Sequence, residues 1–118
     1  MTAPLETDWK NFSAMVPQLR ERYLAKCNAR VAALLTDPKR NESERFWDAT
    51  EAMKKEARVL RICLDDHARS RMWLSILTMI QAGMIEEKDL ADFSEELRQE
   101  VHYAFAEKPG STDRRIWR

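Results

Sequence analysis

The chain has 118 residues, of which 44% are hydrophobic and 34% charged, and its 20 basic and 20 acidic residues give a formal net charge of zero. This length and composition predict one globular domain and exclude a disordered chain. The balanced charge argues against a protein that binds nucleic acid or a membrane surface generically.

Three features predict a cytoplasmic protein. The first residues have neither a basic start nor an apolar stretch, so we expect no secretory signal. The longest largely apolar run, residues 72–80, is too short to cross a bilayer. The two cysteines are too few for a disulfide framework, and we expect both thiols to be reduced.

The composition favours an all-α fold. The chain has only two Gly and four Pro, and no stretch of strand length alternates apolar with polar residues. We predict a compact bundle of four main helices plus a short N-terminal helix. Residues 1–108 form the single helical domain, and residues 109–118 form a linker and a tail rich in Arg.

The first predicted helix is short and covers residues 7–15, with Thr7 or Asp8 as its cap. Pro17 pushes Val16 away from helical geometry, so we expect a break or kink there.

The second predicted helix, residues 18–35, is amphipathic. Its apolar residues recur at helical spacing: Leu19, Tyr23, Cys27, Val31 and Leu34 or Leu35. Another face carries a basic stripe of Arg22, Lys26 and Arg30.

Residues 39–82 contain neither Gly nor Pro. As one helix this segment would be ~66 Å long, whereas a compact domain of this size has a radius of gyration of about 13–14 Å. The segment therefore either bends back or extends to meet a second copy of the chain. Together with the uneven distribution of charge along the chain, this length predicts a homodimer.

The first half of that segment begins with a cap at Asn41 or Ser43 and carries an apolar seam at alternating steps of four and three. The seam residues are Phe46, Thr50, Met53, Ala57, Leu60 and Leu64. We expect the seam either to pack against the helix at residues 18–35 or to form a homodimer contact. Residues 72–80 are apolar almost all round, which predicts a buried central helix and a break between residues 65 and 70.

The last predicted helix runs from residue 88 or 89 to residue 106. Residues 86–100 are acidic and residues 18–71 are basic, so these two parts can satisfy each other within one chain or between two.

No motif predicts catalysis, a cofactor or a metal. Cys63 and His67 share a helix face, and Cys27 or His102 could complete a zinc site, but cysteines on apolar stripes are more often small buried hydrophobes. With two glycines the chain has no Gly-rich phosphate loop, and it has no nucleophile elbow. A helix-turn-helix near residue 83 is disfavoured by acidic residues at the start of its second helix. We therefore expect a protein that is not an enzyme.

The candidate partner-binding residues are basic and aromatic, and they lie in the tail and in the middle of the chain. They are Arg114, Arg115, Ile116, Trp117 and Arg118, with Lys54, Lys55, Arg58 and Arg61. Arg and Trp are favoured anchors at interfaces. The leading interpretation is an interaction or regulatory protein, an adaptor or inhibitor that binds another macromolecule. A phage or mobile-element accessory protein would fit this size. The alternative is a nucleic-acid-associated protein that uses the basic helix faces and the Arg-rich tail.

Overall fold

The computed structural model of the chain describes residues 5–65 and 67–106. These residues form four α-helices and two short 3-10 turns without a strand, which confirms the predicted all-α class. In chain order the elements are α1 (Glu6–Leu35), α2 (Glu42–Leu64), η1 (Arg69–Arg71), α3 (Met72–Gln81), η2 (Glu87–Leu90) and α4 (Glu95–Ala106). The predicted linker and tail, including the candidates at positions 114–118, lie outside the described residues.

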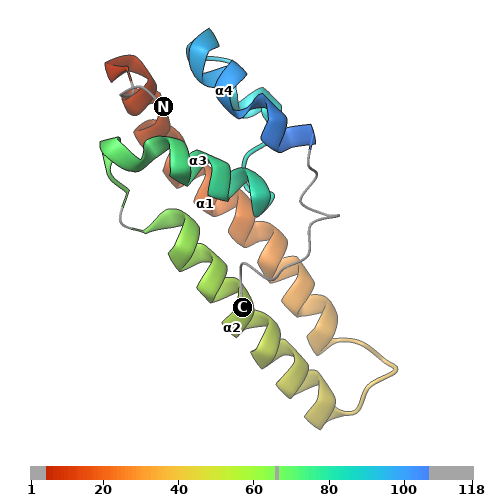
Figure 1. Cartoon of the computed structure of the whole chain (residues 1–118). Coiled ribbons are helices and arrows are strands. Elements are labelled where there is room, and N and C mark those ends of the chain that lie inside the picture. The colour runs from red at the N-terminus through yellow and green to blue at the C-terminus, as the bar shows by residue number, and fades with distance from the viewer. Residues whose placement is uncertain (1–4, 66, 107–118) are drawn as a thin grey trace.

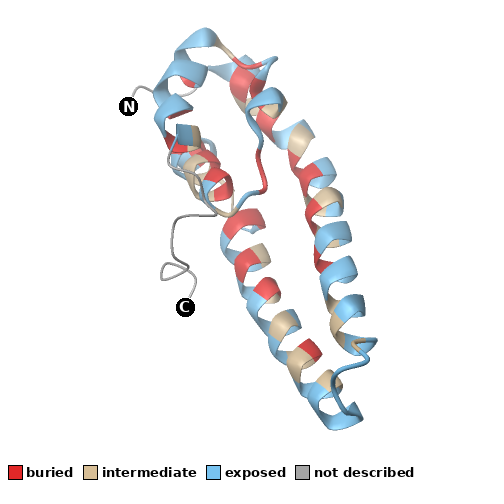
Figure 2. Ribbon diagram, turned by 90° about the vertical axis from the view of Figure 1, so that its right-hand side faces the viewer, coloured by how far each residue is buried: buried red, intermediate tan, exposed pale blue. Residues whose placement is uncertain are grey.

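The described helices pack together as a bundle, as predicted, but the bundle is elongated and not compact. Helices α1 and α2 lie side by side as an antiparallel hairpin, and α3 and α4 lie near the end where α1 begins and α2 ends (Figure 1). The extents are 53 × 25 × 23 Å, and the radius of gyration is 16.4 Å, above the ~13–14 Å of a compact domain of this length. Buried residues gather at one end of the hairpin, and the loop end is mostly exposed (Figure 2).

Helix α1 is continuous through Pro17, so the predicted short N-terminal helix and the break are both wrong. Pro17 is exposed, and so is Ser13, whose carbonyl would otherwise bond to the amide that proline lacks. Water can satisfy that carbonyl. One buried stripe runs past the proline on the opposite side, from Phe12 and Val16 to Leu19, and holds the two halves in line.

The long segment without Gly or Pro bends, as predicted. Asn41 caps α2 with a full capping box, and α2 ends at Leu64. The chain is extended at Asp65 and becomes helical again at η1 and α3. The length of the segment therefore no longer supports a dimer.

Only the end of the seam predicted on α2 packs into the core, where Leu64 is buried and Leu60 is partly buried. The buried residues of the hairpin half of α2 lie on a neighbouring stripe with the same spacing, at Ala49, Glu56, Val59 and Cys63. On the seam itself Phe46 and Met53 are more than half exposed. The heptad spacing is present twice on this helix, and periodicity alone does not show which stripe faces α1.

Helix α3 is the apolar centre of the core, although it is not buried on all sides as predicted. Five of its residues are buried, but Leu74 is 60% exposed. The helix ends in a Schellman motif, in which the Met84 amide donates to the Met79 carbonyl at 2.9 Å. Gly83 occupies the left-handed position at φ 78° that this motif requires.

Helix α4 starts later than predicted, at Glu95 and not at residue 88 or 89. The Ser94 hydroxyl accepts from the Leu97 amide at 3.2 Å and so caps the helix. Ser94 is itself held by the buried Asp8 of α1, whose carboxylate accepts from the Ser94 amide at 2.8 Å and from its hydroxyl at 2.6 Å. Asp8 therefore docks α4 onto α1 and does not cap α1 as the sequence predicted.

Candidate interaction surface

The loop end of the hairpin projects beyond the core as an arm. The last buried residue of α1 is Cys27, and the first of α2 is Ala49. Near the end of this arm Phe46 is 56% exposed and Trp47 59% exposed. Their rings form an edge-to-face pair with centroids 4.9 Å apart, so two large aromatic groups are presented together to solvent.

The exposed seam continues from the aromatic pair towards the core. Met53 is 58% exposed, and Thr50, Ala57 and Leu60 are half-buried. By helical spacing, Leu24 and Val31 of α1 and the exposed Leu35 share a face of their own helix. We call the set of α1 and α2 residues on this side the hairpin face, defined by Leu24, Val31, Leu35, Phe46, Thr50, Met53, Ala57 and Leu60.

A shallow hollow of about 140 Å³ lies at the core end of the hairpin face, between α1 and α2. Its lining residues are Arg20, Leu24, Leu60, Arg61, Leu64 and Asp65. Three leucines give it an apolar floor, and the exposed Arg61 and Asp65 put charge beside it. The hairpin face thus carries an aromatic projection at one end and an apolar hollow at the other.

A buried carboxylate holds the two helices of the hairpin together. Glu56 is 6% exposed and accepts a hydrogen bond from the Tyr23 hydroxyl at 2.6 Å. Arg30, which is half exposed, pairs with the other oxygen of Glu56. Burial, together with the nearby Glu56 charge, raises the pKa of the Cys27 thiol to about 11. These contacts fix the register of α2 against α1 and so keep the hairpin face rigid.

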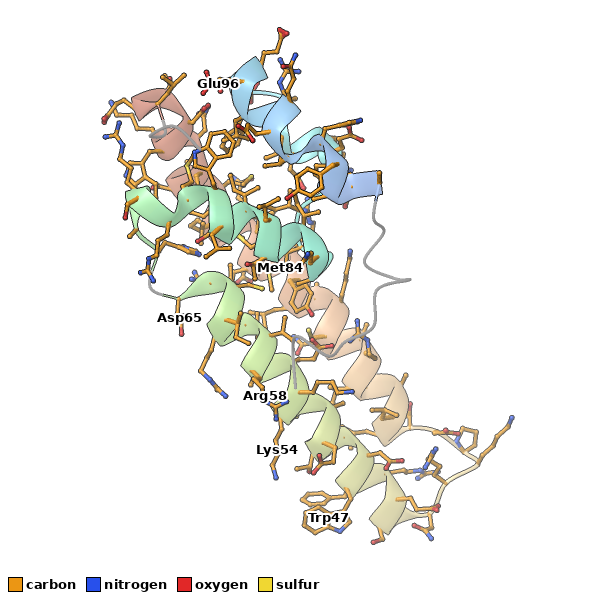
Figure 3. All side chains as sticks on the ribbon, viewed as in Figure 1. Trp47, Lys54, Arg58, Asp65, Met84 and Glu96 are labelled. Carbon is orange, nitrogen blue, oxygen red and sulfur yellow. The ribbon has the colours of Figure 1, made fainter. Side chains whose placement is uncertain are left out.

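The four basic candidates on α2 are all exposed. Trp47, Lys54 and Arg58 project from the side of α2 that is turned away from α1 (Figure 3). Lys54 lies 4.0 Å from Glu51, a weak surface contact. The structure therefore places basic side chains beside the exposed aromatic residue on one helix.

The basic stripe predicted on α1 does not extend this group of basic side chains, because Arg22 and Arg30 are paired with carboxylates. Arg22 donates to both carboxylate oxygens of Asp89, at 3.0 and 2.6 Å, and to the Met84 carbonyl at 2.7 Å. Arg30 is paired with Glu56. The Arg22–Asp89 pair joins the basic middle to the acidic later part within one chain, whereas the Arg30–Glu56 pair lies within the basic middle itself.

Cys63 and His67 are engaged structurally. The His67 ring is within hydrogen-bond distance of the Cys63 carbonyl at 2.8 Å and packs edge-on against Phe12. Burial raises the pKa of the Cys63 thiol to about 12. Within residues 5–65 and 67–106, no group of three or more potential His, Cys, Asp or Glu ligands comes together.

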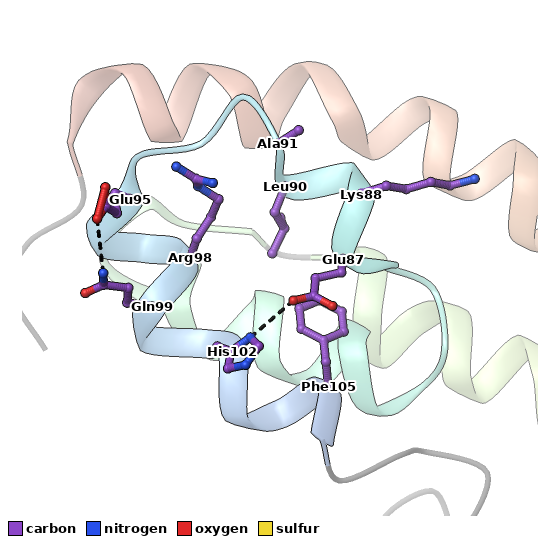
Figure 4. Close-up of a pocket in the computed structure, with 9 residues that line it drawn as sticks. All are labelled: Glu87, Lys88, Leu90, Ala91, Glu95, Arg98, Gln99, His102 and Phe105. Carbon is purple, nitrogen blue, oxygen red and sulfur yellow. Dashed lines mark hydrogen bonds and ion pairs between the residues drawn. The ribbon is translucent and has the colours of Figure 1, made fainter.

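A wider open pocket of about 530 Å³ lies between η2 and α4 (Figure 4). Its polar residues carry both signs of charge, and His102 is 3.1 Å from Glu87. Arg98 and Lys88 line the same pocket, and all four of these residues are exposed. With exposed and mixed charges the pocket has no desolvated group suited to catalysis, so we place the candidate site on the hairpin face.

Sequence reasoning found the basic candidates but missed the aromatic end and the hollow. The heptad pattern places Phe46 on the seam and gives Trp47 no role, although two adjacent aromatic residues in a charged segment are an available signal. The hollow has no sequence signal, because it depends on how Leu24 and Leu60 approach each other across two helices.

No family model, curated protein or solved structure matches the chain. Within the described residues, none of the helices combines the length and the apolar character needed to span a bilayer.

Proposed function

We propose that this is a non-enzymatic interaction protein that acts by binding another protein chain through its hairpin face. The observation that carries the proposal is the aromatic pair, Phe46 and Trp47, exposed together on an arm that projects from the core. Exposed aromatic residues at this density are unusual on a monomer and typical of interface anchors. The homodimer expected from the sequence belongs to this proposal, with a second copy as one such chain.

The rigid hairpin supports the same function. An interface forms with less loss of conformational entropy when the binding surface is preorganised. The buried hydrogen bond between Tyr23 and Glu56 holds α1 and α2 together directly behind that surface. Lys54 and Arg61 at the edge of the face favour a partner with acidic groups opposite them.

The nucleic-acid alternative has less support. Arg22 and Arg30, two of the three basic residues expected to extend the patch across α1, are paired with acidic side chains of the same chain. If the alternative held, duplex or single-stranded nucleic acid would bind at low salt and dissociate steeply as salt rises. Unchanged anisotropy of labelled DNA and RNA at low salt would remove it.

Photo-cross-linking in the source cells tests the proposal. A photoreactive residue in place of Trp47 should give a covalent adduct with another chain, and the same residue in place of Tyr103 should not. Tyr103 is the matched control because it is also aromatic and is 54% exposed, but lies on α4. The same adduct yield at both positions, or no adduct at either position, would contradict the proposed function. Mass spectrometry of the adduct identifies the second chain.

A further inference from the structure

We propose that the occupant of the hairpin face is a second copy of this chain, paired with its α2 antiparallel to the first. The inference rests on the proposed function and names its partner. Two observations carry it: the relation between the aromatic end and the hollow, and the size of the face.

The shape of the face selects the antiparallel orientation. Phe46 and the hollow lie at opposite ends of the exposed part of α2, so a two-fold axis near residue 55 places each Phe46 ring over the hollow of the other chain. Such an interface is self-complementary, because the same surface contributes the projection and the receptor. The hollow of about 140 Å³ is close to the ~150 Å³ of a cavity that accepts a benzene ring. Trp47 would then lie beside Arg61, a favourable pairing of cation and aromatic ring.

The area of the face is sufficient for a stable pair. Helix α2 has 23 residues. At 1.5 Å per residue and a width of two helices, the face covers about 34 by 20 Å, or roughly 700 Å², near the ~800 Å² per partner of a standard interface. Two hairpins pairing in this way would form a four-helix arrangement that covers Phe46 and Met53.

Size-exclusion chromatography with light scattering on the full chain at about 100 µM tests the partner, because mass action favours association at that concentration. We expect twice the chain mass of 13.9 kDa. Phe46→Glu should weaken self-association about a thousandfold, since each dimer loses two aromatic anchors, and should run as a monomer. Leu74→Glu is the matched control, equally exposed but on α3, and should remain a dimer. A monomeric wild type, or a dimeric Phe46→Glu, would overturn the proposal.

Disulfide trapping tests the orientation. In an antiparallel pair centred near residue 55 the two Thr50 positions are ~15 Å apart along the helix axis, whereas Thr50 lies level with position 60, next to Arg61. A mixture of Thr50→Cys and Arg61→Cys chains should therefore cross-link to each other, and Thr50→Cys alone should not. Rapid cross-linking of Thr50→Cys alone would mean a parallel pair and refute the arrangement.

The two proposals fail differently. If the chain is monomeric and the position-47 probe captures a foreign protein, the second copy is excluded and the proposed function stands. If the probe reacts only within its own chain, the face is covered internally and both proposals fall.

Discussion

The hydrogen bond between Tyr23 and Glu56 is the contact that most directly joins α1 to α2. Its O–O distance is 2.6 Å, and both residues are more than 90% buried. Tyr23→Phe removes only the hydroxyl and leaves the ring volume in place, so no cavity is created. A hydrogen bond to a charged group contributes roughly 1.5–3 kcal/mol, and the variant also leaves a buried carboxylate short of one donor. We expect the free energy of unfolding to fall by about 2–3 kcal/mol.

Urea denaturation at a fixed protein concentration measures this loss. The slope with urea should stay unchanged, because the same surface is exposed on unfolding. Tyr103→Phe is the control: it makes the same chemical change at a residue that is 54% exposed, and its effect should stay within about 0.5 kcal/mol. Equal stabilities for the two variants would refute the view that Glu56 locks the hairpin through Tyr23.

Three further predictions concern the buried thiols, the end of α3 and the Arg22–Asp89 pair. Burial raises the pKa of Cys63 to about 12 and of Cys27 to about 11, so the unfolded chain loses these thiol protons at lower pH than the folded chain does. The free energy of unfolding should therefore hold below pH ~9 and then fall by about 1.4 kcal/mol per thiol per pH unit. Thermal melts would show this loss, and alanine at both positions should reduce it. Gly83→Ala should lower the free energy of unfolding by roughly 1 kcal/mol through backbone strain alone, since no atom lies within 4 Å of the added Cβ. A change near zero in urea denaturation would contradict the Schellman assignment. Burial raises the pKa of Asp89, but hydrogen bonds from Arg22 and from a backbone amide outweigh this effect and leave the pKa below its ordinary value. The stabilisation from the Arg22–Asp89 pair is therefore present above pH ~4 and lost as pH falls through the folded pKa. Asp89→Asn should speed hydrogen exchange of α4 at neutral pH, and unchanged exchange would show that the Arg22–Asp89 pair does not hold α4 in place.

The sequence predicted the all-α class, the capped start of α2 and the bend after Leu64, because each depends on local signals. The effect of Pro17 depends on which side of α1 meets solvent, and with the buried stripe on the other side the helix continues through the proline. The start of α4 was misplaced for a similar reason. Its cap is held by Asp8, a contact between residues 86 positions apart that no local pattern reports.

The candidate site was predicted only in part. The basic residues of α2 could be found by composition, but the assignment of its two heptad stripes required the position of α1. Glu56 illustrates the difficulty. From the sequence, a carboxylate at this position predicts a solvated side chain, whereas in the structure it is buried and pairs with Tyr23 and Arg30. The exposed seam, which includes Met53, follows from that assignment.

The central claim is that the hairpin face is covered in solution by a second chain. Hydroxyl-radical footprinting of the wild type at about 1 and 100 µM tests it directly, because association follows mass action. We expect oxidation of Met53 and Trp47 to fall severalfold at the higher concentration, with Leu74 and Tyr103 unchanged. Oxidation of all four residues at the same rate at both concentrations would contradict the claim.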